Sequence, residues 1–402
     1  MLETKKTNNL ILSFACYMNL AIGFLPIVDH YCPWYITVIP FILLLAVAVK
    51  NQESLFLVLD LFLFIILFFC VEFWGVYRNN DIINYLINFV IAFLPIIFAA
   101  LVQREQKDIN FYRNYLQVAA IFAAITAITT IIGLKVYPMA SRELASGTAI
   151  YDTTKYGAMN IGGYQYIYAM VMFVPIMLFL IKNAEGLKKG FNILLLVAIC
   201  LCVYESQYTI ALITLVLSFL IIWFCSIKKR EGKIFIVIAV ILFFVLGGSL
   251  LSSLFGWLSS IMKKEYVADR FLQLSQLFSG QAINTGTSAE RIEYYEQQIN
   301  AFFSSPIWGH NIFTYSSDYV SGHSTILDVL GAFGIIGIIA IVFIVKAINK
   351  RVFNKKSWSK YSKSVWIMLC IIAILNPVIF STNILVPFMG TVCIMKIDEL
   401  SE

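Results

Sequence analysis

Charged residues are scarce in this sequence. Asp, Glu, Lys and Arg together make up 13% of the 402 residues, whereas roughly a quarter is typical of soluble domains. Hydrophobic residues rise to 60%, and phenylalanine alone occurs 33 times. A water-soluble fold with so few charges has no way to cover that much apolar surface. The composition therefore predicts an integral membrane protein.

Motifs for metals, disulfides and nucleotides are also missing. The eight cysteines are scattered, and no CxxC or Cys/His spacing occurs, so we predict neither a disulfide framework nor a metal site. No Rossmann-type glycine motif and no internal repeat is present. The net charge of +6 suggests an acidic partner, but the basic residues sort by membrane side, as described below. We therefore predict no nucleic-acid partner.

Apolar runs long enough to cross a membrane recur along the whole chain. A hydrocarbon core needs about 20 apolar helical residues, and twelve runs approach that length. They are 10–28, 34–49, 54–75, 82–102, 114–134, 164–181, 190–204, 207–226, 234–255, 325–347, 364–381 and 383–395. The last two could instead be one broken helix and a hairpin. The predicted fold is an all-α integral membrane protein with about twelve transmembrane helices, forming one polytopic domain over 1–402.

The basic residues fix the predicted orientation. With the N-terminus in the cytoplasm, 21 of the 29 Lys and Arg residues fall in cytoplasmic segments and 8 in outer ones. Cytoplasmic loops carry such an excess. Both termini are therefore predicted to be cytoplasmic.

Two predicted outer loops are too long to be simple connectors. They cover 135–163 and 256–324. The second loop has apolar residues at helical spacing, including Val267 and Phe271 in one stripe and Ile292 and Tyr295 in another. The pattern predicts amphipathic helices that lie on the bilayer surface or cap the bundle.

A histidine at the mouth of a predicted span is a candidate for chemistry. His323 stands just before the 325–347 span, on the outer side. An imidazole there can take a proton from a sugar hydroxyl near neutral pH. The alternative is an interfacial histidine satisfied by Ser324 or water.

Arginines on the outer side are candidates for binding phosphate. Guanidinium binds phosphate in bidentate fashion and stays charged when partly desolvated. Arg291 and Arg270 lie on the predicted amphipathic helices, and Arg142 lies in the other outer loop. The alternative is that these side chains reach toward lipid headgroups. Asp60, inside a predicted span, is either a helix-packing group or an ion-coupling site.

A set of short motifs resembles the O-antigen ligase/polymerase superfamily, and within it the Wzy-type polysaccharide polymerases. Arg291 opens the motif in Arg-Ile-Glu-Tyr-Tyr, and Pro306-Ile-Trp-Gly309 follows. His323-Ser-Thr-Ile-Leu-Asp comes next, and then Gly331-Ala-Phe-Gly-Ile-Ile-Gly. The motifs span roughly 290–340, while span number and loop position extend the resemblance along the chain.

The resemblance implies a GT-C-like fold and a metal-independent glycosyltransferase without a cofactor. Arg291 would bind the donor's pyrophosphate, and His323 would activate the acceptor hydroxyl. Similar proteins often carry another arginine where this chain has Glu205-Ser-Gln-Tyr-Thr, so Arg142 or Arg270 would take its part. The further candidates for binding pyrophosphate or glycan are Arg270, Arg142, His310 and Tyr294.

The predicted function follows from the resemblance. The chain would polymerise lipid-linked repeat units of O-antigen, capsule or exopolysaccharide in the bacterial cytoplasmic (inner) membrane. Its partners would be undecaprenyl-pyrophosphate-linked glycans, membrane lipids, and flippase and chain-length regulator proteins. The alternatives are a ligase of the same superfamily, a polysaccharide flippase or transporter, and a non-catalytic scaffold.

Overall fold

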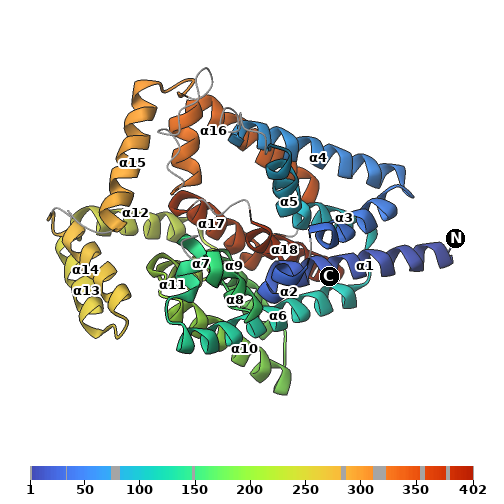
Figure 1. Ribbon diagram of the computed structural model, residues 1–402, viewed down its shortest axis with the longest axis horizontal. Coiled ribbons are helices and arrows are strands. Elements are labelled where there is room, and N and C mark those ends of the chain that lie inside the picture. The colour runs from blue at the N-terminus through green and yellow to red at the C-terminus, as the bar shows by residue number, and fades with distance from the viewer. Residues whose placement is uncertain are drawn as a thin grey trace.

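The computed structural model describes residues 2–32, 34–73, 82–146, 150–281, 287–310, 323–353, 358–376 and 381–401. Within these residues all regular secondary structure is helical, which confirms the predicted all-α class (Figure 1). In chain order the helices are α1 (Leu2–Phe24), α2 (Pro26–Tyr31), α3 (Trp34–Ala48), α4 (Gln52–Phe73), α5 (Ile82–Glu105), α6 (Ile109–Val136), α7 (Ala140–Ser146), α8 (Ile150–Ala158), α9 (Tyr164–Lys182), α10 (Gly186–Glu205), α11 (Thr209–Ser226), α12 (Arg230–Leu246), α13 (Gly248–Ile261), α14 (Glu265–Phe278), α15 (Thr287–Ser304), α16 (Thr325–Val352), α17 (Lys360–Leu375) and α18 (Thr382–Ser401).

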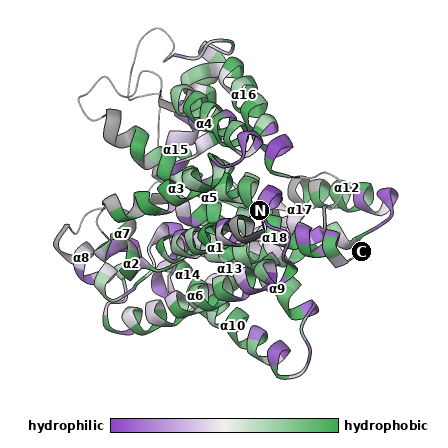
Figure 2. Cartoon of the chain, turned by 90° about the vertical axis from the view of Figure 1, so that its right-hand side faces the viewer, coloured by the Kyte–Doolittle hydropathy of each residue, from purple (hydrophilic) through white to green (hydrophobic). Residues whose placement is uncertain are grey.

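The apolar helices are those of a membrane-embedded bundle. Each of the twelve predicted intervals contains helix. Figure 2 shows hydrophobic residues along the helices and hydrophilic residues gathered near many of their ends. Among the described residues, six helical segments are long and apolar enough to cross a membrane, namely Gln52–Cys70, Ile109–Val136, Tyr164–Lys182, Gly186–Glu205, Thr209–Ser226 and Thr325–Val352.

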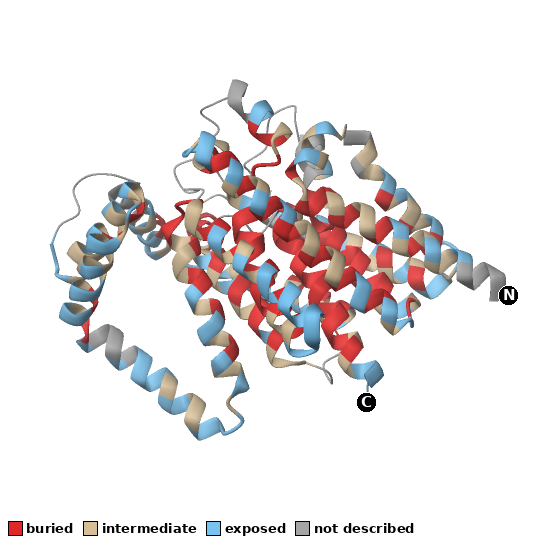
Figure 3. Cartoon of the chain, turned by 90° about the horizontal axis from the view of Figure 1, so that it is seen from below, coloured by how far each residue is buried: buried red, intermediate tan, exposed pale blue. Residues whose placement is uncertain are grey.

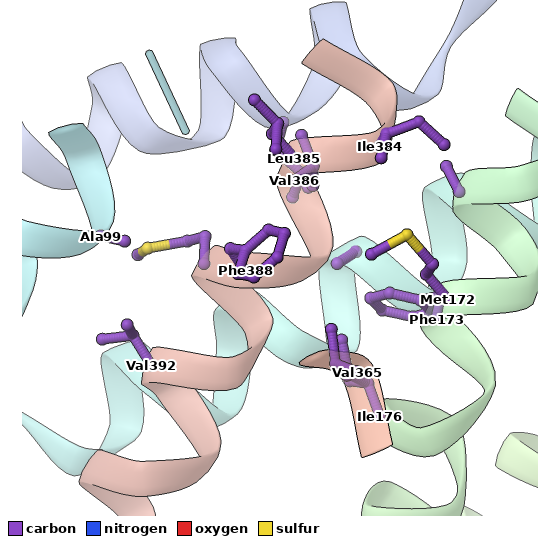
Figure 4. Packing of buried hydrophobic residues seen from close by; sticks show 14 of the residues in the cluster. Ala99, Met172, Phe173, Ile176, Val365, Ile384, Leu385, Val386, Phe388 and Val392 are labelled. Carbon is purple, nitrogen blue, oxygen red and sulfur yellow. The ribbon is translucent and has the colours of Figure 1, made fainter. Parts of the chain in front are cut away.

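Helix α18 lies at the centre of the bundle. Every residue from 383 to 395 is buried, as expected of a helix that is surrounded by others on all sides. Figure 4 shows Phe388 and Val392 of α18 among side chains that include Ala99 of α5 and Phe173 of α9. Figure 3 shows the buried residues concentrated in this central region. The core is thus built from helices far apart in the sequence.

The two chain termini lie at the same end of the bundle. α18 begins beside the end of α1, where Asn383 Nδ2 donates to the Gly23 carbonyl at 2.6 Å. Figure 1 labels both termini in its right-hand half. Lys50 and Asn8 meet there, with Nζ and Oδ1 2.8 Å apart. We name this the terminal end, and the end that carries α2, α7 and α8 the distal end.

The predicted span over 234–255 is wrong as a single helix. The apolar run breaks at Gly247, between α12 and α13. α13 turns onto α14, where Phe255 and Phe271 stack with ring centroids 6.0 Å apart. A Cβ on Gly248 would lie 3.2 Å from the last carbonyl oxygen of α14, so the glycine permits this close approach. Adjacent glycines therefore divide a run whose apolar composition alone favours one helix.

Helix α16 is bent at Gly334, whose φ of 59° and ψ of −154° interrupt the helical backbone. Figure 1 shows the part before the bend beside α15, and the part after it along α4. The freed N–H groups of Ile335 and Ile336 donate to the carbonyls of Pro306 and Ile307 at 2.9 and 3.3 Å. Backbone groups freed within a membrane protein need such partners. The segment after α15 supplies them.

We expect Gly309→Ala to destabilise this contact. Gly309 has a φ of 66°, and a Cβ there would lie 2.4 Å from the backbone of Ala332. Alanine in the left-handed region costs a further 1–2 kcal/mol, roughly. The matched control is Gly190→Ala in α10, where nothing lies within 4 Å of the added Cβ. Thermal denaturation in detergent should show a lower midpoint for Gly309→Ala alone, and equal midpoints would contradict the assigned contact.

Asp60 forms an ion pair inside the bundle. Its Oδ2 accepts a hydrogen bond from Arg351 Nε of α16, and Arg351 Nη1 donates to the Ala347 carbonyl at 2.9 Å. Pairing removes the cost of an isolated charge within a span. The arrangement favours helix packing over ion coupling as the role of Asp60.

Asp60→Asn should therefore destabilise the protein, because it leaves Arg351 without its carboxylate. The pair is only partly buried, with 40% of the Asp60 side chain exposed, so we expect a coupling of about 0.5–1 kcal/mol. A double-mutant cycle with Arg351→Gln, followed by thermal denaturation, measures it. Additive effects of the two substitutions would contradict the assigned pairing.

Candidate functional site

The candidate site lies at the distal end, where segments distant in sequence meet. The loop helix α7, the start of α9, the start of α11 and the end of α17 all contribute, together with α14, α15 and the first part of α16. Their described side chains are mainly arginines, tyrosines and amides. We describe the site from its arginines outward.

Two arginines converge on one phenol. Arg142 Nη2 of α7 donates to Tyr266 Oη at 2.6 Å, and Arg270 Nη2 of α14 donates to the same oxygen. The Arg142 guanidinium also lies over the Tyr266 ring, 3.6 Å from its centroid. Arg270 Nη1 donates to Gln273 Oε1 at 3.0 Å. Tyr266 thus brings together two of the predicted phosphate-binding residues.

Arg142 also reaches the segment where the resemblance predicts an arginine. Its Nη1 donates to the Gln207 carbonyl at 3.2 Å, and its guanidinium carbon lies 5.6 Å from the Tyr208 ring centroid. Gln207 has a φ of 59°, an uncommon conformation for a residue other than glycine. The Tyr208 hydroxyl donates to the Ser141 carbonyl beside Arg142. A guanidinium group therefore occupies this position, supplied by α7 and not by the segment itself.

Arg291 lies in the first turns of α15 and faces two phenols. These belong to Tyr164, at the start of α9, and Tyr295, one turn further along α15. Tyr164 Oη also donates to Asn376 Oδ1, and Tyr295 Oη donates to the Leu375 carbonyl at 3.3 Å. Arg291 is thereby held against the distal ends of α9 and α17.

Two buried donors at this place have no hydrogen-bond partner within the described chain. They are Arg291 Nη1 and Asn376 Nδ2. Buried polar groups without a partner are rare in folded proteins, because their desolvation is not compensated. Two unpartnered donors in one neighbourhood indicate a ligand rich in hydrogen-bond acceptors.

The positive charges at the site act on one another. Burial lowers the pKa of Arg142, and the charges of Arg270 and Arg291 lower it further, whereas Tyr266 and Tyr208 raise it. An arginine remains protonated in spite of such shifts. Within the described residues, no carboxylate lies within 4 Å of Arg142 or Arg291, and the nearby Glu205 pairs with Lys264 at 2.6 Å. Arg142 and Arg291 are thus outside any ion pair among these residues, although the buried carboxylate of Asp328 acts on Tyr295 beside Arg291.

His323 lies beside α15, at the level of Tyr294, which is one turn further along the helix than Arg291. Its ring stacks on Tyr294, with centroids 4.8 Å apart and the planes 20° from parallel. The following residue, Ser324, caps α16 by accepting the N–H of Leu327 at 3.2 Å. The structure therefore brings Arg291, Tyr294 and His323 to the same part of α15.

The structure places His310 elsewhere. Its Nε2 lies 2.8 Å from Ser304 Oγ and 3.1 Å from the Ala301 carbonyl, at the other end of α15. At 1.5 Å per residue, Ser304 is about 20 Å along the helix from Arg291. The described contacts of His310 are those of a group that covers the C-terminus of α15.

Several site residues were not among the predicted ones. Tyr164, Tyr266 and Asn376 come from three segments far apart in the chain and outside the motif region. A tyrosine at a helix end in a membrane protein normally indicates an interfacial anchor. The sequence carries no signal that distinguishes the two tyrosines from such anchors, or Asn376 from an ordinary helix-end residue.

Comparison with known proteins adds no further assignment. No protein-family model matches the chain, and no curated protein matches it.

Proposed function

We propose that this chain is a membrane glycosyltransferase that polymerises lipid-linked oligosaccharide repeat units at the outer face of a bacterial cytoplasmic membrane. The observation that carries the proposal is the clustered positive charge of Arg142 and Arg291, neither of which forms an ion pair within the described residues, together with the unpartnered donors Arg291 Nη1 and Asn376 Nδ2. A diphosphate supplies negative charge and several acceptor oxygens in one compact group. A diphosphate-linked lipid therefore fits the site.

The finer topology belongs to the same proposal. Twelve spans would cross the membrane in a GT-C-like arrangement, with α12 in place of the divided 234–255 run as the ninth span and both termini in the cytoplasm. The distal end would then face outward, with the loops 135–163 and 256–324. The common location of the termini and the helices found in all twelve intervals support this arrangement. Labelling from outside intact cells tests it, with single cysteines introduced after the eight native ones are replaced. A cysteine at the exposed position 135 should react, and one at the exposed position 229 should not.

In the proposed reaction the donor already carries its leaving group. The imidazole of His323 takes the proton from an acceptor sugar hydroxyl. The hydroxyl oxygen then bonds to the anomeric carbon of the growing chain, while the bond from that carbon to the diphosphate oxygen breaks. The electron pair leaves with undecaprenyl pyrophosphate, whose charge the arginines stabilise. No nucleotide or metal is needed to activate this donor.

The main contribution of the helical bundle is to position the two substrates relative to each other. Arg142, Arg270 and Arg291 come from three helices, so a lipid diphosphate held among them would be fixed at several points. The Tyr294–His323 stack would set the acceptor beside it. Holding two substrates in this way removes much of the entropic barrier to their reaction.

Deletion of the gene in its source cell tests the proposal. Loss of a polymerase should leave glycans one repeat unit long, separated by gel electrophoresis, while a plasmid copy restores the long chains. Long chains that accumulate on undecaprenyl pyrophosphate would indicate a ligase of the same superfamily. Repeat units trapped on the cytoplasmic side would indicate a transporter. An unchanged glycan profile would contradict all three enzymatic and transport functions.

A further inference from the structure

A second unpartnered group lies on the same face of α15 as Arg291. Gln298 is 1% exposed, and both its Nε2 and its Oε1 lack a hydrogen-bond partner within the described chain. Burying a complete amide without a partner is costly, and apolar residues of similar size are available to fill such a position. Its retention between two helices therefore requires an explanation.

The position of Gln298 connects it to the site. It follows Arg291 by seven residues, which places both on one face of the helix, about 10 Å apart along the axis. Tyr295 lies between them on that face and contacts the end of α17 through its hydroxyl. The first sugar of a diphosphate-linked glycan can bridge such a distance.

The opposing helix leaves room for the amide. Gln298 faces Gly331 of α16, where an added Cβ would lie 2.3 Å from Gln298 Oε1. Because residue 331 is a glycine, only a hydrogen atom lies between the α16 backbone and the Gln298 amide, where any other residue would place a side chain. Gly331 belongs to the glycine-rich motif in which Gly334 forms the bend in α16.

We infer that Gln298 is a specificity-determining residue that hydrogen-bonds a hydroxyl or acetamido group on the sugar attached to the donor diphosphate. An amide offers both a donor and an acceptor, which is what such sugar substituents require. The Gln298 amide lies against Gly331, and on binding it turns along α15 toward Arg291. The inference rests on the proposed function, because it assumes a diphosphate-linked glycan at Arg291.

Three variants separate this role from packing. Gln298→Met keeps the length of the side chain and removes its amide. Gly331→Ala keeps the Gln298 amide, but the added methyl group displaces it from its position. Asn349→Leu is the control, because Asn349 Oδ1 is another buried, unpartnered amide oxygen and lies toward the far end of α16.

The experiment measures binding of two probes to the full-length protein in detergent. One is undecaprenyl pyrophosphate without sugar, and the other is the lipid-linked repeat unit extracted from the source cells. Wild type should bind the glycosylated lipid more tightly. Gln298→Met and Gly331→Ala should each reduce that preference about tenfold, the effect of one to two lost hydrogen bonds, and leave binding of the sugar-free lipid unchanged. Asn349→Leu should retain the full preference.

Stability provides the second measurement. The thermal midpoint of Gln298→Met should equal or exceed that of wild type, because an unsatisfied buried amide has been removed. A lower midpoint with weaker binding of both lipids would assign Gln298 to packing and overturn the inference. Full preference in Gln298→Met, or none in wild type, would also overturn it. If wild type binds neither lipid, the proposed function itself fails, and this inference fails with it.

Discussion

Replacing Arg291 with methionine should reduce glycan polymerisation by about 10²–10³-fold, the loss typical of removing a group that stabilises transition-state charge. Methionine preserves the unbranched stem of the side chain and deletes the guanidinium. In the proposed reaction that group binds the donor diphosphate and stabilises the charge that develops as it leaves. Binding of undecaprenyl pyrophosphate should therefore weaken together with the rate.

The free energy of unfolding should change little on this substitution. Arg291 Nη1 is buried without a partner, and within the described residues no carboxylate pairs with the side chain. Its removal therefore breaks no ion pair, and the stability should fall only by the loss of its hydrogen bonds with Tyr164 and Tyr295, about 1 kcal/mol each. Arg113→Met, which deletes an exposed guanidinium in α6, is the matched control and should change neither quantity. Normal chain length in Arg291→Met cells with equal expression would remove Arg291 from the mechanism.

A loss of stability in Arg291→Met much larger than these two hydrogen bonds account for would have a different meaning. It would assign Arg291 to holding α15 against Tyr164 and the end of α17. Arg291→Lys then distinguishes the two roles. A lysine keeps the charge and lacks the planar fork of donors, so it should restore folding and recover only part of the rate.

The motif region could be predicted from sequence because its residues are close along the chain. Arg291 and Tyr294 are one turn apart on a helix whose apolar spacing is visible, and His323 precedes the next apolar run. The structure adds the reason for the remaining spacing. The segment after α15 bonds to the bend in α16, so the two helices are joined at one end and diverge little at the other. Pro306 and Gly334, read from sequence as separate motif elements, form a single contact.

The tertiary partners of the site residues could not be predicted from the sequence. Tyr266 joins Arg142 and Arg270 across more than a hundred residues, and no local pattern encodes such a pairing. The break at Gly247 and the bend at Gly334 also escaped prediction, because a glycine within an apolar run is compatible with continuous helix. Their effect depends on what lies opposite, such as the last carbonyl of α14 for Gly248.

Asp60 and Gln298 show why a polar residue in an apolar helix does not by itself indicate function. Both are polar groups among apolar helices. Asp60 has a charged partner in Arg351, which accounts for its presence through helix packing. Gln298 has none in the described chain. The distinction requires the neighbours of each group, which only the fold provides.

His323→Ala should slow polymerisation by about 10²–10⁴-fold, the contribution of a positioned general base. The imidazole takes a proton only when the acceptor hydroxyl attacks, so its loss should affect the chemical step and leave the donor bound. His323→Ala should consequently retain the affinity of wild type for undecaprenyl pyrophosphate, in contrast to Arg291→Met. Measuring binding and turnover in both variants separates the two roles.

The stack with Tyr294 provides an internal control for this prediction. Tyr294→Phe keeps the ring that packs against His323 and removes only the hydroxyl, whereas Tyr294→Leu removes the stack. If the stack serves to orient the imidazole, Tyr294→Phe should be nearly as active as wild type and Tyr294→Leu should lose part of the rate. Equal polymer length in wild type and His323→Ala would exclude His323 as the base. If the His323→Ala protein no longer binds undecaprenyl pyrophosphate, the imidazole would instead be assigned to binding the diphosphate. A general base contacts the acceptor hydroxyl, so its loss should not affect binding of the donor lipid alone.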